Sequence, residues 1–361
     1  LDGTYQCPPG TNRYAELLIK HLKRPEIPSD VQAFVPSKSI SMKDHESGWK
    51  KAKERTAAGY SGLHFGMYKA HLKRPMMAAL DASMRSVAYQ TGFCYTRWKK
   101  GVDVQLLKRS RDYRAEKLRT IILMEADFNM NNKFLGREIM KVGERHRWFT
   151  KDNYGGRKGH QAAEVSLNSK LVCDSIRGKR TRAIIISNDA KGCYDRIAHT
   201  VLRLATGRLG IPDPAVASMV VGIQAMEHFI CTAFGTSTDT YGPDSDKPPK
   251  QGMLQGNGAG PAGWFAVSSV IIDAMKAQGF GLKDWSLIRK RTYEIGGFAF
   301  VDDTDLIHAN PDPNVTTEEL IEEAQQALNT WHGLIRATGG DLAPEKRRVA
   351  DIFTEGLVLP C

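Results

Sequence analysis

The paired carboxylates Asp302 and Asp303 are the first residues of this chain whose types and positions could do chemistry. They follow the apolar run GFAF and precede a second apolar run that resumes at Leu306, so they lie at the tip of a predicted hairpin of two short strands. Like charges this close are costly unless a partner compensates them. By itself, the stretch allows a metal, an ion pair or a polar turn.

A third carboxylate, Asp189, follows a separate β-branched run, RAIIIS, which is typical of a buried strand. If the two strands are neighbours in one sheet, the three acids meet at one edge and require a counter-cation to stay ionised. Open sites with hard oxygen ligands suit Mg²⁺, and two such ions about 4 Å apart align an attacking 3′-hydroxyl with a leaving pyrophosphate. The alternative is a helix N-cap beside an ordinary acidic turn.

Hydrophobic periodicity predicts the elements around these acids. A helix follows Asp189 and ends near Gly207 and Gly210, and a glycine-rich loop, GMLQGNGAGP, leads into a second, apolar helix. A third helix begins at a capping box of Thr316 and Glu319 and ends at Gly339–Gly340. Its apolar face comprises Leu320, Ala324, Leu328, Trp331 and Ile335.

The first half of the chain is predicted to be more helical. Residues 1–40 are expected to form an irregular leader, and residues 47–92 a helical region interrupted by glycines. Two strands, VDVQLL and LRTIILM, are joined by a basic turn. Residues 130–178 are expected to be mainly helix around the loop NYGGRKGHQ, and residues 240–250 to be a loop or hairpin tip.

The positive charge of the chain is clustered. Of 361 residues, 41% are hydrophobic and 25% charged, which suffices for a large core, and the net charge is +11. Basic residues gather at 107–119, 177–182 and 346–348. This clustering favours a polyanionic partner, nucleic acid first, over merely solvated faces.

Composition argues against several other classes. No apolar run approaches the roughly 18 residues of a membrane helix, and no secretory signal pattern is present. The six cysteines are scattered without a C-x-x-C pair, which argues against a zinc ribbon or a disulfide framework. We therefore expect an intracellular, reducing compartment, nuclear or cytoplasmic, and no membrane partner. The sequence does not indicate an oligomeric state.

In order and spacing, these motifs resemble the reverse transcriptases, particularly those of non-LTR retroelements. NDAKGCYD resembles their first palm motif, LQGNGAGPAGW the Q-G-x-x-x-S-P motif, and FVDD the Y/F-x-D-D motif. The similarity covers roughly residues 47–355. LLKRSRDYRAEKLRTIIL resembles the fingers hairpin, NYGGRKGHQAAEVSL the loop before the palm, and ATGGDLAPEKR the G-L-x-L-N-x-x-K motif.

The resemblance implies a two-metal active site. Asp189 and Asp302 would hold two Mg²⁺ ions, for which Mn²⁺ could substitute, and Asp303 would be the second acid of the pair. The backbone carbonyl of Ala190 would be a further oxygen ligand. Lys346 matches the lysine of the late motif, which would donate a proton to pyrophosphate, although a surface lysine fits the sequence equally well.

The resemblance also assigns residues to the incoming nucleotide. Tyr194 would lie under its sugar and exclude a 2′-hydroxyl, and Gln255 and Gly256 would lie beside the nascent base pair and the template. Lys108 and Arg119 would bind the triphosphate, where arginine supplies a bidentate fork. In addition, Arg157 would grip the phosphate backbone of the template.

Three departures from the family pattern change no group that the mechanism needs. Leu118-Arg119-Thr120 replaces the common Arg-Pro-Ile, Gly260-Pro261 replaces Ser-Pro, and Val301 replaces a small residue. The chain lacks an initiator Met, and only residues 347–361 follow Lys346. We therefore expect a fragment of a longer product, whose activity in isolation is uncertain.

The expected fold is α+β, a right-hand polymerase palm of antiparallel strands backed by helices, with a mostly helical fingers region and a thumb that is absent or truncated. The predicted segments are a leader at 1–40, fingers at 41–180, palm at 181–205, a fingers insertion at 206–250, and palm with the start of the post-palm segment at 251–361. The expected activity is RNA-templated DNA synthesis, with an RNA template, a DNA or RNA primer and dNTPs as partners.

Two alternatives remain open at this point. An RNA-dependent RNA polymerase shares the palm and its metals, but usually has G-D-D where this chain has V-D-D, and a polar residue at the position of Tyr194. A non-catalytic, nucleic-acid-binding remnant would use the basic runs equally well. The three intact acids argue against the remnant.

Overall fold

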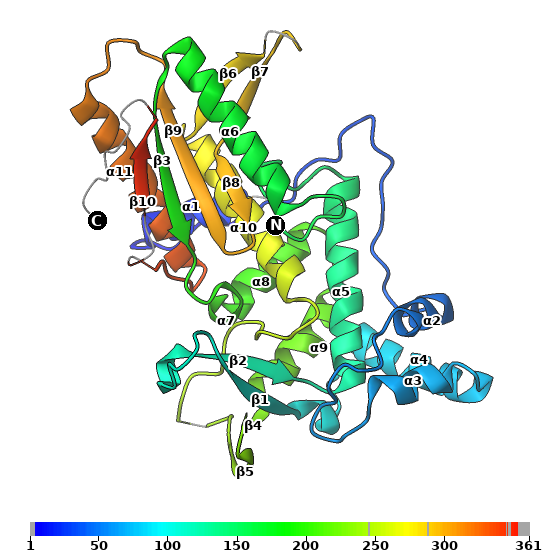
Figure 1. Cartoon of the computed structure of the whole chain (residues 1–361). Coiled ribbons are helices and arrows are strands. Elements are labelled where there is room, and N and C mark those ends of the chain that lie inside the picture. Colours follow the sequence, from blue (N-terminus) through cyan, green and yellow to red (C-terminus); the bar gives the residue numbers. More distant parts are fainter. Residues whose placement is uncertain (1–3, 245, 287–288, 344, 346–347, 353–361) are drawn as a thin grey trace. The chain divides into compact units, whose positions relative to one another are not determined.

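The computed structural model describes residues 4–244, 246–286, 289–343, 345 and 348–352 (Figure 1). Helices and mainly antiparallel sheets make up these residues, in agreement with the expected α+β class. The chain divides into two compact units. The first unit comprises residues 1–31, 146–208 and 264–361, and the second unit comprises residues 32–145 and 209–263.

A four-stranded antiparallel sheet forms the centre of the first unit. Its strand order is β10-β3-β9-β8, formed by Arg348–Asp351, Arg182–Asp189, Asp303–Asn310 and Gly297–Phe300. Strands β3 and β9 pair along their whole lengths, from Arg182 opposite Asn310 to Asp189 opposite Asp303. The predicted neighbourhood of the two acid-bearing strands is therefore confirmed.

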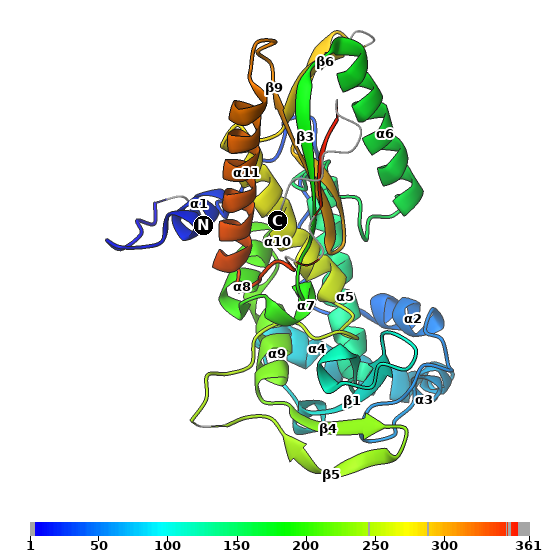
Figure 2. The same cartoon turned by 60° about the vertical axis from the view of Figure 1, so that its left-hand side comes forward.

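Helices cover both faces of this sheet (Figure 2). On one face, Val172 and Ile176 of α6 form an apolar cluster with Phe298 and Ile307. On the other face, α11 contacts β3 and β9, and His308 of β9 bonds Glu323 of α11 at 2.9 Å. The helices of the first unit are α1 (Arg13–His21), α6 (Ala162–Lys179), α7 (Cys193–Arg196), α8 (His199–Arg208), α10 (Gly260–Ala277, from Trp264 onward) and α11 (Thr317–Ala337). Strands β6 (Leu282–Ser286) and β7 (Arg291–Ile295) form a separate hairpin.

The second unit contains a sheet of order β2-β1-β4-β5. Strands β1 (Lys100–Leu107) and β2 (Leu118–Leu123) pair antiparallel, as the two predicted strands should. Strand β4 (Glu227–Thr232) runs parallel to β1, and β5 (Gly235–Tyr241) is the edge strand. The helices are α2 (Met42–Lys50), α3 (Phe65–His71), α4 (Pro75–Thr91), α5 (Ala126–Arg145) and α9 (Asp213–Gln224), with short 3₁₀ turns at Thr96–Lys99 and Ala115–Lys117.

Two local expectations need correction. The N-terminal 40 residues were expected to be irregular, but they contain α1, which Asn12 caps and which packs on α11. The single helix expected after Asp189 is two helices, α7 and α8, and Gly207 lies inside α8. The break occurs because Ile197 is extended and the amide of Ala198 donates to the carbonyl of Thr338, a tertiary contact.

The last long helix matches its prediction closely. Thr316 and Glu319 form the reciprocal capping box at the start of α11, and all five residues of the expected apolar face are buried. The structure groups residues 146–180 with the sheet of the first unit, whereas the sequence placed them in the fingers. The assignment of fingers and palm itself stays a prediction. None of the described helices is both long and apolar enough to cross a membrane.

Candidate active site

The three predicted acids lie together at one edge of the first unit's sheet. Asp189 is the last residue of β3 and pairs with Asp303, the first residue of β9, so their side chains leave the same face of the sheet. Asp302 lies in the turn before β9, and its carbonyl accepts a hydrogen bond from the amide of Ala190 at 3.1 Å. Asp189 is 8% exposed, whereas Asp302 and Asp303 are exposed.

The acidic turn is short and strained. Only Val301 and Asp302 connect β8 to β9, which is the length of a tight hairpin turn. Val301 has φ 61°, a left-handed conformation that β-branched residues rarely adopt. The indole of Trp264 donates a hydrogen bond to the carbonyl of Val301. This contact from α10 stabilises the turn that presents Asp302.

The predicted pre-palm loop supports the hairpin from the β8 side. The amide of Tyr154 donates to the carbonyl of Ala299 at 2.9 Å, and the amide of Ala299 donates to the carbonyl of Asp152 at 2.8 Å. Gly155 lies against the acidic turn, since a Cβ built on it would be 2.4 Å from the nitrogen of Val301. The loop therefore fixes the height of the turn.

The predicted late motif lies on the other side of the acids. The amide of Ala343 donates to the carbonyl of Asp189 at 3.0 Å, and the amide of Lys191 donates to the carbonyl of Asp341 at 2.9 Å. These bonds use the groups on either side of Ala190, whose carbonyl was predicted to be a metal ligand. Lys346, the predicted proton donor of this motif, lies outside the described residues.

The acids create a negative potential around α7. Burial raises the pKa of the Cys193 thiol to about 12, and the carboxylates of Asp302, Asp195 and Asp189 add to the shift. Burial also raises the pKa of Tyr194, with Cys193 and Asp302 contributing. Tyr194, the predicted sugar-sensing residue, is half-buried and within the electrostatic reach of Asp302.

Hard, negatively charged oxygen donors at a negative potential fit a divalent cation such as Mg²⁺. Asp189, Asp302 and Asp303 supply such donors from two paired strands. Among the described residues, no group of three or more His, Cys, Asp or Glu side chains is arranged closely enough to hold a metal ion. The assignment of metal ligands therefore stays a prediction that rests on donor chemistry and on the pairing of the strands.

The predicted triphosphate and base-pair residues lie in the second unit. Arg119 is exposed on β2 opposite Leu106, and Lys108 is exposed directly after β1. The amide of Ile122 in β2 donates to the carbonyl of Gln255 at 2.8 Å. Arg119 and Gln255 are thus held by one strand.

Gly256 occupies a position that only glycine tolerates. Its φ is 112°, and a Cβ built there would be 2.4 Å from the carbonyl oxygen of Ile122. The side chain of Asn129 holds the same loop at two points, because it donates to the carbonyl of Gly256 at 3.0 Å and accepts from the amide of Gly258 at 2.8 Å. The close backbone approach predicted for this glycine is therefore toward β2.

Arg157 has a structural environment in the first unit. Its guanidinium donates to the carbonyls of Thr150 and Asn153, each at 3.3 Å, and lies 5.9 Å from the ring centroid of Phe265. It is half-buried, so it closes the loop that supports β8. A contact with template phosphate stays a prediction.

Sequence reasoning missed the residues that support the acidic hairpin. The buried carboxylate of Asp152 accepts from the amide of Gly296 at 2.8 Å and pairs with Lys276 at 3.2 Å, and burial raises its pKa. Trp264 and Asp341 are further examples. Their partners lie at least 37 residues away or across a turn, so periodicity carries no signal for them.

Comparison with known proteins adds no family. No family model matches the chain, and no curated protein matches it. The resemblance to reverse transcriptases therefore rests on the motifs and on their placement in the structure.

Proposed function

We propose that this chain is the reverse transcriptase domain of a retroelement and catalyses RNA-templated addition of deoxynucleotides to a primer 3′-hydroxyl, on a right-hand polymerase palm. The observation that supports this most strongly is the pairing of Asp189 with Asp303, which gathers three motif acids at one sheet edge. These acids come from segments 113 residues apart, 189 and 302, and their sequence order matches the motif order of the family.

Asp189 and Asp302 would hold the metal ions, with Asp303 and the Ala190 carbonyl as further oxygen donors. Bound Mg²⁺ would activate the primer 3′-hydroxyl and offset the charge that develops on the pyrophosphate. The loop at 152–155 and the indole of Trp264 fix the position of the turn, so Asp302 needs little reorganisation when substrate binds.

Other residues of the chain would position the nucleotide. The rigid ring of Tyr194 would leave no space for a 2′-hydroxyl and so select deoxynucleotides. Lys108 and Arg119, both exposed on the β1–β2 hairpin, would bind the triphosphate, and Gln255 and Gly256 would contact the templating base pair.

Primer extension tests this proposal. We expect the chain to extend a DNA or RNA primer on an RNA template with dNTPs and Mg²⁺, and to use ribonucleotides poorly. Asp302→Ala should abolish incorporation. Equal incorporation by the wild type and Asp302→Ala would contradict the proposal, and a preference for ribonucleotides would instead indicate an RNA-dependent RNA polymerase.

A second candidate is nucleic-acid binding without catalysis, which the basic β1–β2 hairpin favours. Between residues 108 and 119 it exposes six lysines and arginines, of which Arg114 pairs with Asp112 at 2.9 Å. Strong, salt-dependent binding of RNA by a chain that never incorporates nucleotides, in either unit's wild-type context, would favour this candidate.

A further inference from the structure

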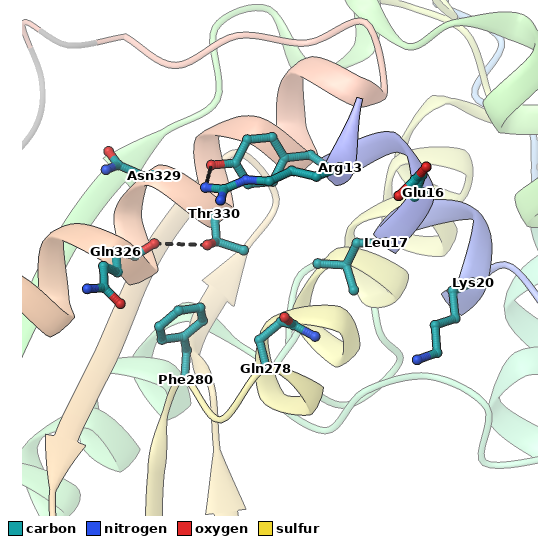
Figure 3. A pocket seen from close by; sticks show the side chains of 10 residues that line it. Arg13, Glu16, Leu17, Lys20, Gln278, Phe280, Gln326, Asn329 and Thr330 are labelled. Carbon is teal, nitrogen blue, oxygen red and sulfur yellow. Dashed lines mark hydrogen bonds between the residues drawn. The ribbon is translucent and has the colours of Figure 1, made fainter. Parts of the chain in front are cut away.

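A cavity in the first unit lies away from the acids, between α1 and α11. It has a volume of about 510 Å³, which is within the range of small-ligand sites. Figure 3 shows Arg13, Leu17 and Lys20 on α1, Gln326, Asn329 and Thr330 on α11, and Gln278 and Phe280 at the end of α10 and beyond it. A second cavity of about 510 Å³ shares Tyr14 and Asn329 with the first.

Aromatic rings form fixed surfaces in these cavities. Tyr14 lines both, and its ring packs against Gly333, where a Cβ would be 2.3 Å from the ring. Phe280 is half-buried, and His308 contacts it edge-on with 6.0 Å between the ring centroids. Neither ring needs to move to present a face or an edge to a planar ligand.

The charged groups of the cavities are mainly cationic. Arg13 and Lys20 line the first cavity with one carboxylate, Glu16, and Arg336 lines the second. The guanidinium of Arg13 lies 4.5 Å from the centroid of the Tyr14 ring. In the described part of the chain, Lys20 has no ion-pair partner, so its ammonium can accept an anion.

Three amide side chains, Gln278, Gln326 and Asn329, complete the first cavity. Each offers a donor pair and an acceptor, the complement that base edges require. The amide of Gln325 donates to the Asn329 carbonyl at 2.8 Å, which leaves the Asn329 NH₂ group directed to other partners. The hydroxyl of Thr330 is already bonded to the Gln326 backbone carbonyl at 2.9 Å.

We propose that the α1–α11 cavity binds a nucleotide, with its phosphate on Arg13 and Lys20, its base against Tyr14 or Phe280, and its base edge on the three amides. An apolar ligand would leave these cations and amides unpaired, and a metal cation would be repelled. The nucleotide is either free or one unit of an RNA single strand, since both present the same chemistry. The site is separate from the acidic edge and does not depend on polymerase activity.

Photo-cross-linking tests the proposal in the full chain. A short single-stranded RNA that carries 4-thiouridine, and 4-thio-UMP alone, would each be cross-linked and the modified peptides identified. We expect modification of peptides from α1, α11 or the Phe280 segment. Cross-linking by the strand alone identifies a strand subsite, and cross-linking by both probes identifies a free-nucleotide site. Cross-links confined to other segments would overturn the proposal.

Matched variants separate this site from general charge. Arg13→Gln with Lys20→Gln should lower the cross-link yield at these peptides roughly tenfold, the effect of losing charged hydrogen bonds. The control pair Lys170→Gln with Lys283→Gln, also exposed in the first unit, should leave it unchanged. Gln278→Ala, at an exposed position, should also reduce the yield. Equal losses in both pairs, or equal displacement of the probes by oligoglutamate, would contradict nucleotide recognition.

Discussion

Replacing Gly155 by alanine should displace the acidic turn. The added Cβ would lie 2.4 Å from the nitrogen of Val301, 3.0 Å from its Cγ2 and 3.1 Å from the carbonyl carbon of Phe300. Two of these three atoms belong to the backbone, so no side-chain rotation relieves the overlap. Overpacking of this kind costs about 1–3 kcal/mol.

Hydrogen–deuterium exchange of peptides from β8 and β9 measures this cost locally. A loss of about 1–3 kcal/mol in the local opening free energy accelerates exchange by about five- to 150-fold. Gly178→Ala is the matched control, because no atom lies within 4 Å of its added Cβ and it lies inside α6. This control should be neutral or stabilising by up to about 1 kcal/mol. If both variants exchange alike at β8 and β9, the loop does not support the turn as described.

Three further predictions concern the rest of the site and the second unit. Gly256→Ala should reduce dNTP incorporation and lower the melting temperature, because its Cβ would be 2.4 Å from the Ile122 carbonyl; an unchanged melting temperature would refute the packing. Tyr194→Ala should admit ribonucleotides in primer extension, and unchanged discrimination would exclude Tyr194 as the sugar-sensing residue. Burial, then Arg85, lowers the pKa of His45 from 6.5 to about 4. Because the unfolded chain binds the proton more tightly, stability present above pH 6.5 should fall by up to about 3 kcal/mol as the pH drops to 4. His45→Gln should flatten this dependence in urea unfolding, and an unaltered slope would contradict it.

The sequence predicted the parts of the site that depend on local pattern. The isoleucines of β3 and the alternation around Asp302 and Asp303 indicate strands, because buried strands favour β-branched residues. The capping box of α11 is equally local, since Thr316 and Glu319 bond each other's backbones. The pairing of β3 with β9 followed from the demand of the acids for a shared cation, and the structure has that pairing.

The parts that the sequence did not predict are tertiary contacts. The loop at 152–155 lies along β8 through backbone bonds that carry no side-chain signature. The α1 helix is stable because its buried face meets α11, more than 300 residues later. The placement of Trp264 under the turn depends on the start of α10. In each case the deciding partner is far away in sequence, so no window of residues contains the information.

The central claim is that Asp302 is a catalytic carboxylate and that its neighbours on the same hairpin are not. The most direct measurement is single-nucleotide incorporation on an RNA template with Mg²⁺, comparing Asp302→Asn with Asp305→Asn. Asp305 is half-buried and pairs with Ser187 two positions further along the same strands. We expect incorporation to fall by several orders of magnitude in Asp302→Asn and to remain within about tenfold of wild type in Asp305→Asn. Equal activities in the two variants would contradict the account.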